Sequence, residues 1–292
     1  MAMDQAAQRR SSENPRQAPR LLEAPGGVLL VEALLAQGAD TAFCVPGESY
    51  LPVLDALYDV RDRIRLVTCR QEGGAAFMAE AHGKLTGRPG ICFVTRGPGA
   101  SNAAIGVHTA KQDSTPMILF IGQVSRAHRD REAFQEVDYA AMFGGLAKWA
   151  AEIPEAARIP EYVSRAFRVA TTGRPGPVVL ALPEEVLSSR AAAEILPPVP
   201  YPGPAPAAGA MRDLELRLAL ASRPLMIVGG SGWTPAAIDH LARFAERQDI
   251  PVAASFRRQS LFDNDSPHYA GDLGLGPNPK LAERVRNADL LI

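Results

Sequence analysis

The segment 66–124 constrains the fold more strongly than any other part of the chain. Three apolar runs of strand length, at 66–68, 91–94 and 117–121, alternate with two longer runs rich in small residues. This alternation predicts parallel strands joined by helices, which is the α/β class. In such a sheet, ligands bind outside the carboxyl ends of the strands. Glu72 is expected there, because it follows one strand and begins a helical run.

Similar runs extend the pattern along the first two thirds of the chain. We expect helices at 28–37, 51–58 and 159–170, and buried strands at 41–45 and 177–182. Together with the three runs above, these make five strands. The sequence therefore predicts a first α/β domain over residues 26–190.

The remaining segments define the domain limits. Residues 1–25 are polar, predict a disordered tail and lack the apolar centre of a secretory signal. The proline-dense stretch within 191–209 predicts a stiff linker. In the second domain, 210–292, we expect helices at 211–220 and 236–248 and strands at 224–228 and 251–254. The last residues, 287–292, predict the first half of another buried strand, so we expect the chain to be a fragment with a truncated second domain.

Composition excludes several classes of function. A net charge of −1, with 47% hydrophobic and 22% charged residues, gives no reason to expect a nucleic acid or a membrane as partner. The three cysteines, Cys44, Cys69 and Cys92, fit neither a metal pair nor a disulfide framework, and we interpret them as core residues of a cytoplasmic protein. The five histidines show no metal-ligand spacing, so no metal site is predicted.

Two further segments carry less information about function. The loop 125–132 contains many charges of both signs, which is typical of a solvated surface loop. Residues 230–235 approach the GxGxxG dinucleotide-binding pattern, but Pro235 replaces the third glycine and no acidic residue follows the next strand. This argues against NAD binding.

Two features around the carboxyl ends of the strands allow alternative interpretations. Glu72 could simply interact with the helix dipole, or it could be a buried carboxyl beside a flat ligand that approaches the small residues Gly73, Gly74, Ala75 and Ala76. The segment 97–102, GPGASN, could be a tight strand–helix turn or a wall of backbone N–H groups around a ligand. It is not a P-loop, because it lacks the GK[ST] ending.

Taken together, these segments resemble the thiamine-diphosphate-dependent enzymes of the acetolactate synthase-like family. The resemblance is carried by TAFCVPGESYLPVLDAL (41–57), RQEGGAAFMAEA (70–81), VTRGPGASN (94–102), GQV (122–124), FQE (134–136), RPGPVVLALP (174–183) and the segment 251–279. It implies a flavodoxin-like pyrimidine-binding domain followed by an incomplete Rossmann-like central domain. In the family, a third domain, outside this sequence, holds the diphosphate and Mg2+.

The resemblance also implies roles for individual residues. Glu72 would hydrogen-bond N1′ of the cofactor aminopyrimidine, and Gln135 would line the substrate side of the thiazolium ring. The remaining cofactor-binding positions lie in two glycine-containing segments: Pro46 and Gly47, and Gly97, Pro98, Gly99 and Asn102. The chemistry requires a carboxyl in a water-poor pocket, where its hydrogen bond is strong and its proton can be shared.

Two positions depart from the family pattern. Pro183-Glu184-Glu185 stands where acetolactate synthases have Pro-Lys-Asp, and Ser125-Arg126 stands where they have Pro-Arg. The first change reverses a charge near the site. Both favour a 2-keto acid other than pyruvate, or an acyl substrate.

The resemblance thus predicts a thiamine-diphosphate-dependent 2-keto acid decarboxylase or carboligase. The expected cofactors are thiamine diphosphate and, through the absent domain, Mg2+; whether FAD binds stays open. A homodimer or homotetramer is expected in the full-length form. The alternative hypothesis is a non-catalytic assembly or regulatory subunit that retains the fold.

Overall fold

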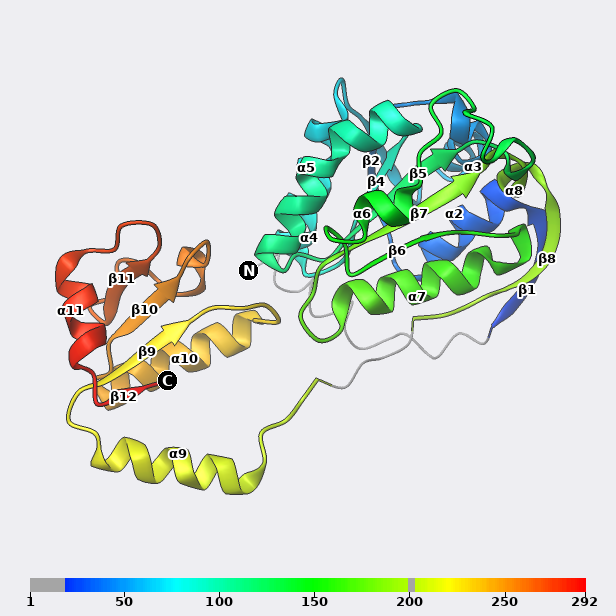
Figure 1. Ribbon diagram of the computed structural model, residues 1–292. Coiled ribbons are helices and arrows are strands. Elements are labelled where there is room, and N and C mark those ends of the chain that lie inside the picture. The colour runs from blue at the N-terminus through cyan, green and yellow to red at the C-terminus, as the bar shows by residue number, and fades with distance from the viewer. Residues whose placement is uncertain (1–18, 199–202) are drawn as a thin grey trace. The chain divides into compact units, whose positions relative to one another are not determined.

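The computed structural model describes residues 19–198 and 203–292. The chain divides into two compact units, residues 1–201 and 202–292. Each unit is an α/β structure with its own parallel sheet, which confirms the predicted fold class (Figure 1). The two units are described separately.

The first unit is built on a six-stranded parallel sheet. In spatial order, its strands are β3 (Arg65–Thr68), β2 (Thr41–Cys44), β4 (Gly90–Val94), β5 (Met117–Gln123), β7 (Pro177–Pro183) and β6 (Trp149–Glu152). Every residue of β4, β5 and β7 is buried, as expected for central strands covered on both faces. Cys44 and Cys92 are buried in β2 and β4, which confirms that they are core residues.

Helices cover both faces of this sheet and form two separate hydrophobic cores. The elements are α2 (Gly26–Ala36), α3 (Leu51–Asp59), α4 (Glu72–Thr86), α5 (Gly97–Asp113), α6 (Tyr139–Phe143), α7 (Ile159–Thr171) and α8 (Glu184–Ser188), with short 3-10 turns η1 (Glu48–Tyr50), η2 (Arg126–His128) and η3 (Ala156–Arg158). Helices α2, α3, α7 and α8 contribute to the core on one face. Helices α4, α5 and α6 contribute to the core on the other.

Two antiparallel strands at the ends of the first unit correct the predicted boundaries. Strand β1 (Arg20–Pro25) pairs with β8 (Arg190–Ile195). Ala24, Ala193 and Ile195 are buried and join the core beside α2. The prediction of disorder is therefore wrong for residues 20–25. Their few apolar side chains give too weak a local signal for a strand, and the strand forms through pairing with a distant segment. Residues 1–18 lie outside the described residues.

The same pairing shortens the predicted linker. Residues 191–195 belong to β8, and residues 208 and 209 already belong to α9 (Ala208–Leu220). Within the predicted linker, residues 199–202 lie outside the described residues.

Strand β6 was also missing from the prediction. Its sequence, WAAE, is short and half-buried at the edge of the sheet, so it lacks the apolar signal of the central strands.

The second unit has a four-stranded parallel sheet. Its strands, in spatial order, are β11 (Tyr269–Leu273), β10 (Val252–Ser255), β9 (Pro224–Val228) and β12 (Leu290–Leu291). Its other elements are α9, α10 (Pro235–Gln248), η4 (Gln259–Leu261) and α11 (Pro279–Asn287). The predicted strand at the end of the chain is confirmed, but it is not buried here: Leu291 is 51% exposed, because β12 pairs only with β9.

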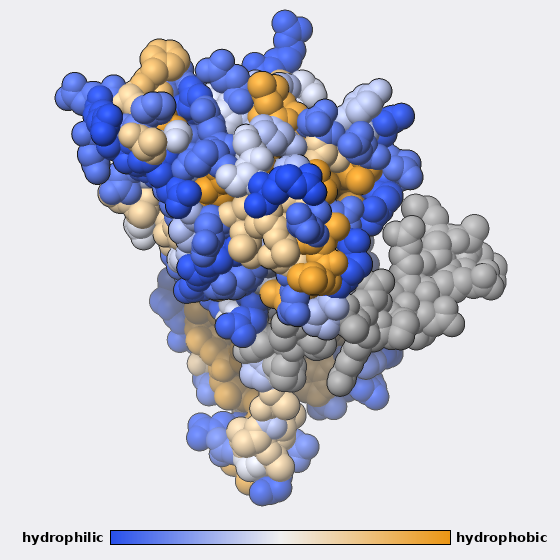
Figure 2. Space-filling view, turned by 90° about the vertical axis from the view of Figure 1, so that its right-hand side faces the viewer, coloured by the Kyte–Doolittle hydropathy of each residue, from blue (hydrophilic) through white to orange (hydrophobic). Residues whose placement is uncertain are grey.

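The surface of the described residues carries polar and apolar side chains side by side. In the view of Figure 2, hydrophilic residues cover much of the visible face and hydrophobic residues occupy smaller areas between them. Across 19–198 and 203–292, no helix combines the length and the apolar character that a membrane crossing requires.

Candidate functional site

The candidate site lies at the carboxyl edge of the six-stranded sheet. From β2 the chain crosses to β3 on one side, whereas from β4 it crosses to β5 on the other side. Ligands of open α/β sheets bind at such a reversal of strand order. The segments that follow β2, β3 and β4 carry Gly47, Glu72 and Gly97, so the fold brings all three predicted positions to this edge.

Glu72 is the first residue of α4 and is half-buried. Its Oε2 accepts a hydrogen bond from Asn102 Nδ2 at 2.9 Å. Its Oε1 accepts no hydrogen bond from any described residue, and none of the described arginines or lysines forms an ion pair with it. The carboxyl is thus oriented by one neutral donor and keeps one oxygen available. The cap of the same helix is supplied by Gln71, whose Oε1 accepts a hydrogen bond from the Gly74 N–H at 2.8 Å.

The segment Gly97 to Asn102 is helical, which corrects the predicted strand–helix turn. Helix α5 begins at Gly97 itself, directly after Arg96, with Pro98 in its first turn. Proline is well tolerated there because the first N–H groups of a helix have no intrahelical partner. Asn102 therefore lies on the second turn, and its side chain reaches α4 rather than capping α5.

Close packing of α4 against α5 sets the distance between Glu72 and Asn102. A Cβ at Gly106 would lie 2.4 Å from Ala76 Cβ, and a Cβ at Gly73 would lie 3.2 Å from the Asn102 carbonyl oxygen. Ala75 and Ala76 are fully buried in the core of this face. The interpretation that these two alanines leave room for a flat ligand is therefore wrong, because the room is filled by α5. Gly74 alone is exposed and open.

Thr95 connects the segments after β2 and β4, and sequence reasoning missed it. A Cβ at Gly47 would lie 2.6 Å from Thr95 Cβ, so glycine is required at this contact. The hydroxyl of Thr95 is 2.9 Å from that of Ser49, which is fully buried. A Cβ at Gly99 would lie 3.1 Å from Thr95 Cγ2 and 3.7 Å from Glu72 Oε1. Pro46, Pro98 and Asn102 are exposed beside this group.

Gln135 reaches the same edge through the long loop between β5 and α6. Its carbonyl oxygen accepts a hydrogen bond from the Gly97 N–H at 3.1 Å. Its backbone has a left-handed φ of +65° and its side chain is half-buried. The structure thus places the backbone of Gln135 against the start of α5, next to the group that contains Glu72.

An arginine that sequence reasoning also missed lies between two carboxylates at this edge. The Arg96 side chain is 10% exposed, and its Nη1 donates to Glu48 Oε1 at 3.2 Å. Its Nη2 forms an ion pair with Glu184, one of the positions that depart from the family pattern. Burial lowers the pKa of the Arg96 guanidinium, but the hydrogen bonds to Glu184 and Glu48 outweigh it and raise that pKa.

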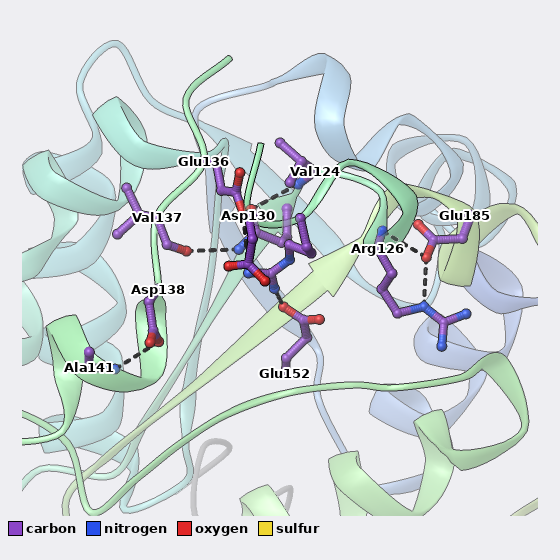
Figure 3. Close-up of polar contacts among 11 residues, drawn as sticks. Val124, Arg126, Asp130, Glu136, Val137, Asp138, Ala141, Glu152 and Glu185 are labelled. Carbon is purple, nitrogen blue, oxygen red and sulfur yellow. Dashed lines mark hydrogen bonds and ion pairs between the residues drawn. The ribbon is translucent and has the colours of Figure 1, made fainter. Parts of the chain in front are cut away.

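The loop that contains the second departure, Ser125, is linked to the segment that contains the first through Arg126 and Glu185. Arg126 Nε donates to Glu185 Oε1 at 2.7 Å, and the Arg126 N–H donates to the same oxygen at 3.1 Å, as Figure 3 shows. Partial burial raises the pKa of Glu185, but the bonds from Arg126 dominate and hold that pKa below its usual range. The charged loop is mainly exposed, as predicted, yet Arg126 ties it to α8.

Other features lie away from these residues. A cleft of about 420 Å³ in the second unit is lined by Arg223, Asp249, Lys280 and Arg284, among others, and contains none of the predicted site residues. The chemically distinctive residues come together at the carboxyl edge of the first sheet instead. Within residues 19–198 and 203–292, no group of three or more histidine, cysteine, aspartate or glutamate side chains is arranged to hold a metal ion.

Two known families match the two units of the chain. Residues 25–142 match the family described as thiamine pyrophosphate enzyme, N-terminal TPP binding domain. Residues 212–292 match the family described as thiamine pyrophosphate enzyme, central domain. All the predicted site residues of the first unit fall within the first match.

The chain is also similar to curated acetolactate synthases. The chain is 34% identical over 267 residues to acetolactate synthase isozyme 2 large subunit of Escherichia coli K12, covering 91% of this chain and 48% of that protein. It is 32% identical over 274 residues to acetolactate synthase of Bacillus subtilis 168, covering 93% and 48%. For the mitochondrial acetolactate synthase catalytic subunit of Saccharomyces cerevisiae, identity is 32% over 284 residues, covering 91% and 40%. The chain therefore spans about half the length of these relatives.

Proposed function

Because the chain belongs to the thiamine pyrophosphate enzyme family, we propose that its first unit binds the aminopyrimidine ring of thiamine diphosphate and that the protein acts on a 2-keto acid or acyl substrate. The reaction class we propose is decarboxylation or carboligation, as in an acetolactate synthase-like enzyme. The similarity to acetolactate synthases supports the class of chemistry. It does not extend to the substrate.

The observation that carries this proposal is the state of the Glu72 carboxyl. It is half-buried, oriented by Asn102 and free of any ion pair with a described residue. A carboxyl held in this way has one oxygen available for a hydrogen bond with a ring nitrogen, whereas one bound by an arginine would be engaged elsewhere. The residues present therefore fit the pyrimidine half of the cofactor.

The roles of the other residues follow from their positions. Glu72 would hold a proton at N1′ of the pyrimidine, and Asn102 would keep the carboxyl aimed there. Gly47, Gly97 and Gly99 would belong to the wall beside the ring, where they let neighbouring segments pack closely: a Cβ at these positions would lie 2.6–3.1 Å from Thr95 or Gln135. Gln135 would face the substrate. When bound, thiamine diphosphate supplies the electron sink for the bond that breaks next to the keto group.

The charge pattern bears on the substrate. Glu184 occupies the position of a lysine in the family pattern, and its carboxylate is engaged by Arg96. The segment after β7 therefore carries a carboxylate paired with Arg96 where the family pattern has a lysine. This reversal of charge favours a 2-keto acid or acyl group other than pyruvate.

We also propose that the protein acts as a homo-oligomer. Four large apolar side chains on α4 and α5 are more than 40% exposed: Phe77, Met78, Leu85 and Ile105. Exposed apolar residues grouped on adjacent helices are typical of a surface that packs against another chain. Sedimentation over a range of protein concentrations, with Ile105→Asp as the disrupting variant, tests this part of the proposal.

Calorimetry with thiamine diphosphate and Mg2+ tests the main proposal. The chain would be titrated alone and together with the half of a relative that it does not cover. We expect binding to weaken about tenfold or more in Glu72→Ala, and to stay unchanged in Glu161→Ala, a matched exposed carboxylate on α7. Equal binding by both variants would contradict the role of Glu72. Binding without turnover in the combined sample would favour the alternative of a non-catalytic subunit.

A further inference from the structure

We propose that Arg129 is a positioning residue that fixes the loop 125–138 and thereby holds Gln135 against the start of α5. The consequence for catalysis rests on the proposed function, because that function gives Gln135 its role. The fixing of the loop itself rests only on contacts within the first unit.

Arg129 links the loop to the sheet. Its Nη2 forms an ion pair with Glu152, the last residue of β6, and its Nη1 lies 3.9 Å from Glu136 Oε1. The three side chains are only 26%, 28% and 14% exposed, respectively. Because of this limited exposure, solvent and salt screen these contacts less than they screen exposed surface ion pairs. Figure 3 shows Glu136 and Glu152 in this cluster.

Glu136 connects Arg129 to the loop backbone through hydrogen bonds. Its Oε1 accepts a hydrogen bond from the Asp130 N–H at 3.0 Å, and its Oε2 accepts one from the Ala133 N–H at 3.2 Å. The hydrogen bond from Asp130, followed by that from Ala133 and the charge of Arg129, lowers the pKa of Glu136. A single carboxylate therefore closes the turn that immediately precedes Gln135.

The backbone of Gln135 needs such support. A left-handed conformation is unfavourable for a residue with a side chain, and Asp130, Glu132 and Gln135 all adopt it, with φ of +60°, +53° and +65°. Such conformations persist where surrounding contacts hold them. On the far side of Gln135, the Gln123 side chain donates to the Val137 carbonyl at 2.9 Å, and Asp138 accepts from the Ala141 N–H at 2.9 Å (Figure 3).

The geometry distinguishes arginine from lysine at position 129. A guanidinium presents separate N–H groups to two carboxylates, whereas an ammonium is a single point charge. Arg129→Lys is therefore expected to keep its contact with only one of Glu136 and Glu152, and to restore only part of the order of the loop 125–138. The neighbouring Arg126–Glu185 contact anchors the start of the loop independently and is more exposed at the arginine, at 49%.

Hydrogen–deuterium exchange on the full 292-residue chain tests the proposal. In Arg129→Met we expect the amides of Gly97, Asp130 and Ala133 to exchange about tenfold faster or more, with partial recovery in Arg129→Lys. Exchange in β4, β5 and β7, and the thermal midpoint, should change little. Glu152→Gln should reproduce the effect, which guards against failure of one variant to fold. The control is Arg158→Met, which removes an exposed ion pair on the same unit.

The outcomes separate this proposal from the proposed function. Unchanged exchange at the three amides in both Arg129→Met and Glu152→Gln would overturn it, as would an equal rise throughout the unit. The positioning role is measured by amide exchange without any cofactor, so it is tested independently of thiamine diphosphate binding. If the loop loosens as expected but the wild-type chain binds no cofactor, the positioning role stands and the proposed function fails.

Discussion

Asn102 Nδ2 lies 2.9 Å from Glu72 Oε2, joining two residues that are 30 positions apart in the sequence. The bond links the second turn of α5 to the first residue of α4, so the direction of the Glu72 carboxyl depends on how the two helices pack.

Removing the Asn102 amide should weaken binding of the cofactor without lowering the stability of the fold. We expect Asn102→Ala to reduce thiamine diphosphate affinity about three- to tenfold, corresponding to the loss of one hydrogen bond of about 1 kcal/mol. Stability should hold or rise slightly, because Asn102 is exposed and alanine favours a helix. Calorimetry measures the affinity. Ser101→Ala, at an exposed neighbouring position, is the control, and equal affinity in both variants would contradict the prediction.

The close approach of α4 and α5 should make Gly106 intolerant of substitution. A methyl group there would lie 2.4 Å from Ala76 Cβ, so Gly106→Ala must push the helices apart. We expect the free energy of unfolding to fall by about 1–3 kcal/mol in urea titrations. Gly74→Ala is the matched control, because its nearest neighbouring atom is 4.0 Å away and the substitution should be neutral or stabilising. A neutral Gly106→Ala would show that the helices can move freely.

The ion pair between Arg96 and Glu184 should appear as a coupling energy. Glu184→Gln leaves the buried guanidinium with Glu48 as its remaining carboxylate and should reduce the free energy of unfolding by about 1–3 kcal/mol. In an Arg96→Met background the same change should cost much less. Urea titrations of the four proteins in this cycle measure the coupling. Additive effects would mean that the pair contributes nothing.

Order in the loop 125–138 should depend on pH through Glu136. Because the folded pKa of Glu136 is lowered, its contribution is fully present above the ordinary value of about 4.3 and is lost as pH falls through the lower folded value. We expect exchange protection of Asp130 and Ala133, corrected for intrinsic rates, to be constant from pH 7 to about 5 and to fall below the ordinary value. Glu136→Gln should lack this step, and a step of equal size in that variant would assign it to another group.

The three cysteines should differ in reactivity. Burial raises the pKa of the Cys44 and Cys92 thiols, and both residues are fully buried. Burial also raises the pKa of Cys69, but this residue is only half-buried. Because the thiolate is the reactive form, a thiol reagent should label Cys69 slowly in the native protein and the other two only after unfolding. Peptide mapping checks the site, and native labelling of Cys92 would be inconsistent with this core.

Local sequence patterns predicted the central part of the fold well. Strands β4, β5 and β7 are long apolar runs, and such runs are recognisable because both faces of a central parallel strand are buried. Strands β1, β6 and β8 were missed because they are partly exposed and depend on distant partners. The sequence left the segment 97–102 open between a tight strand–helix turn and a wall of backbone N–H groups. The structure shows that it is the start of α5, where proline is well tolerated in the first turn.

The sequence by itself determined the α/β class, the family and the candidate roles of Glu72 and Gln135, because strand periodicity and ordered motifs are local properties of the chain. Only the tertiary structure decided which residues surround those two. Thr95, Arg96 and Arg129 become neighbours of the site through strand order and helix packing, and the same packing brings the Asn102 amide to Glu72. Contacts between residues far apart in sequence arise from the packing of whole elements, so no short pattern along the chain could have indicated them.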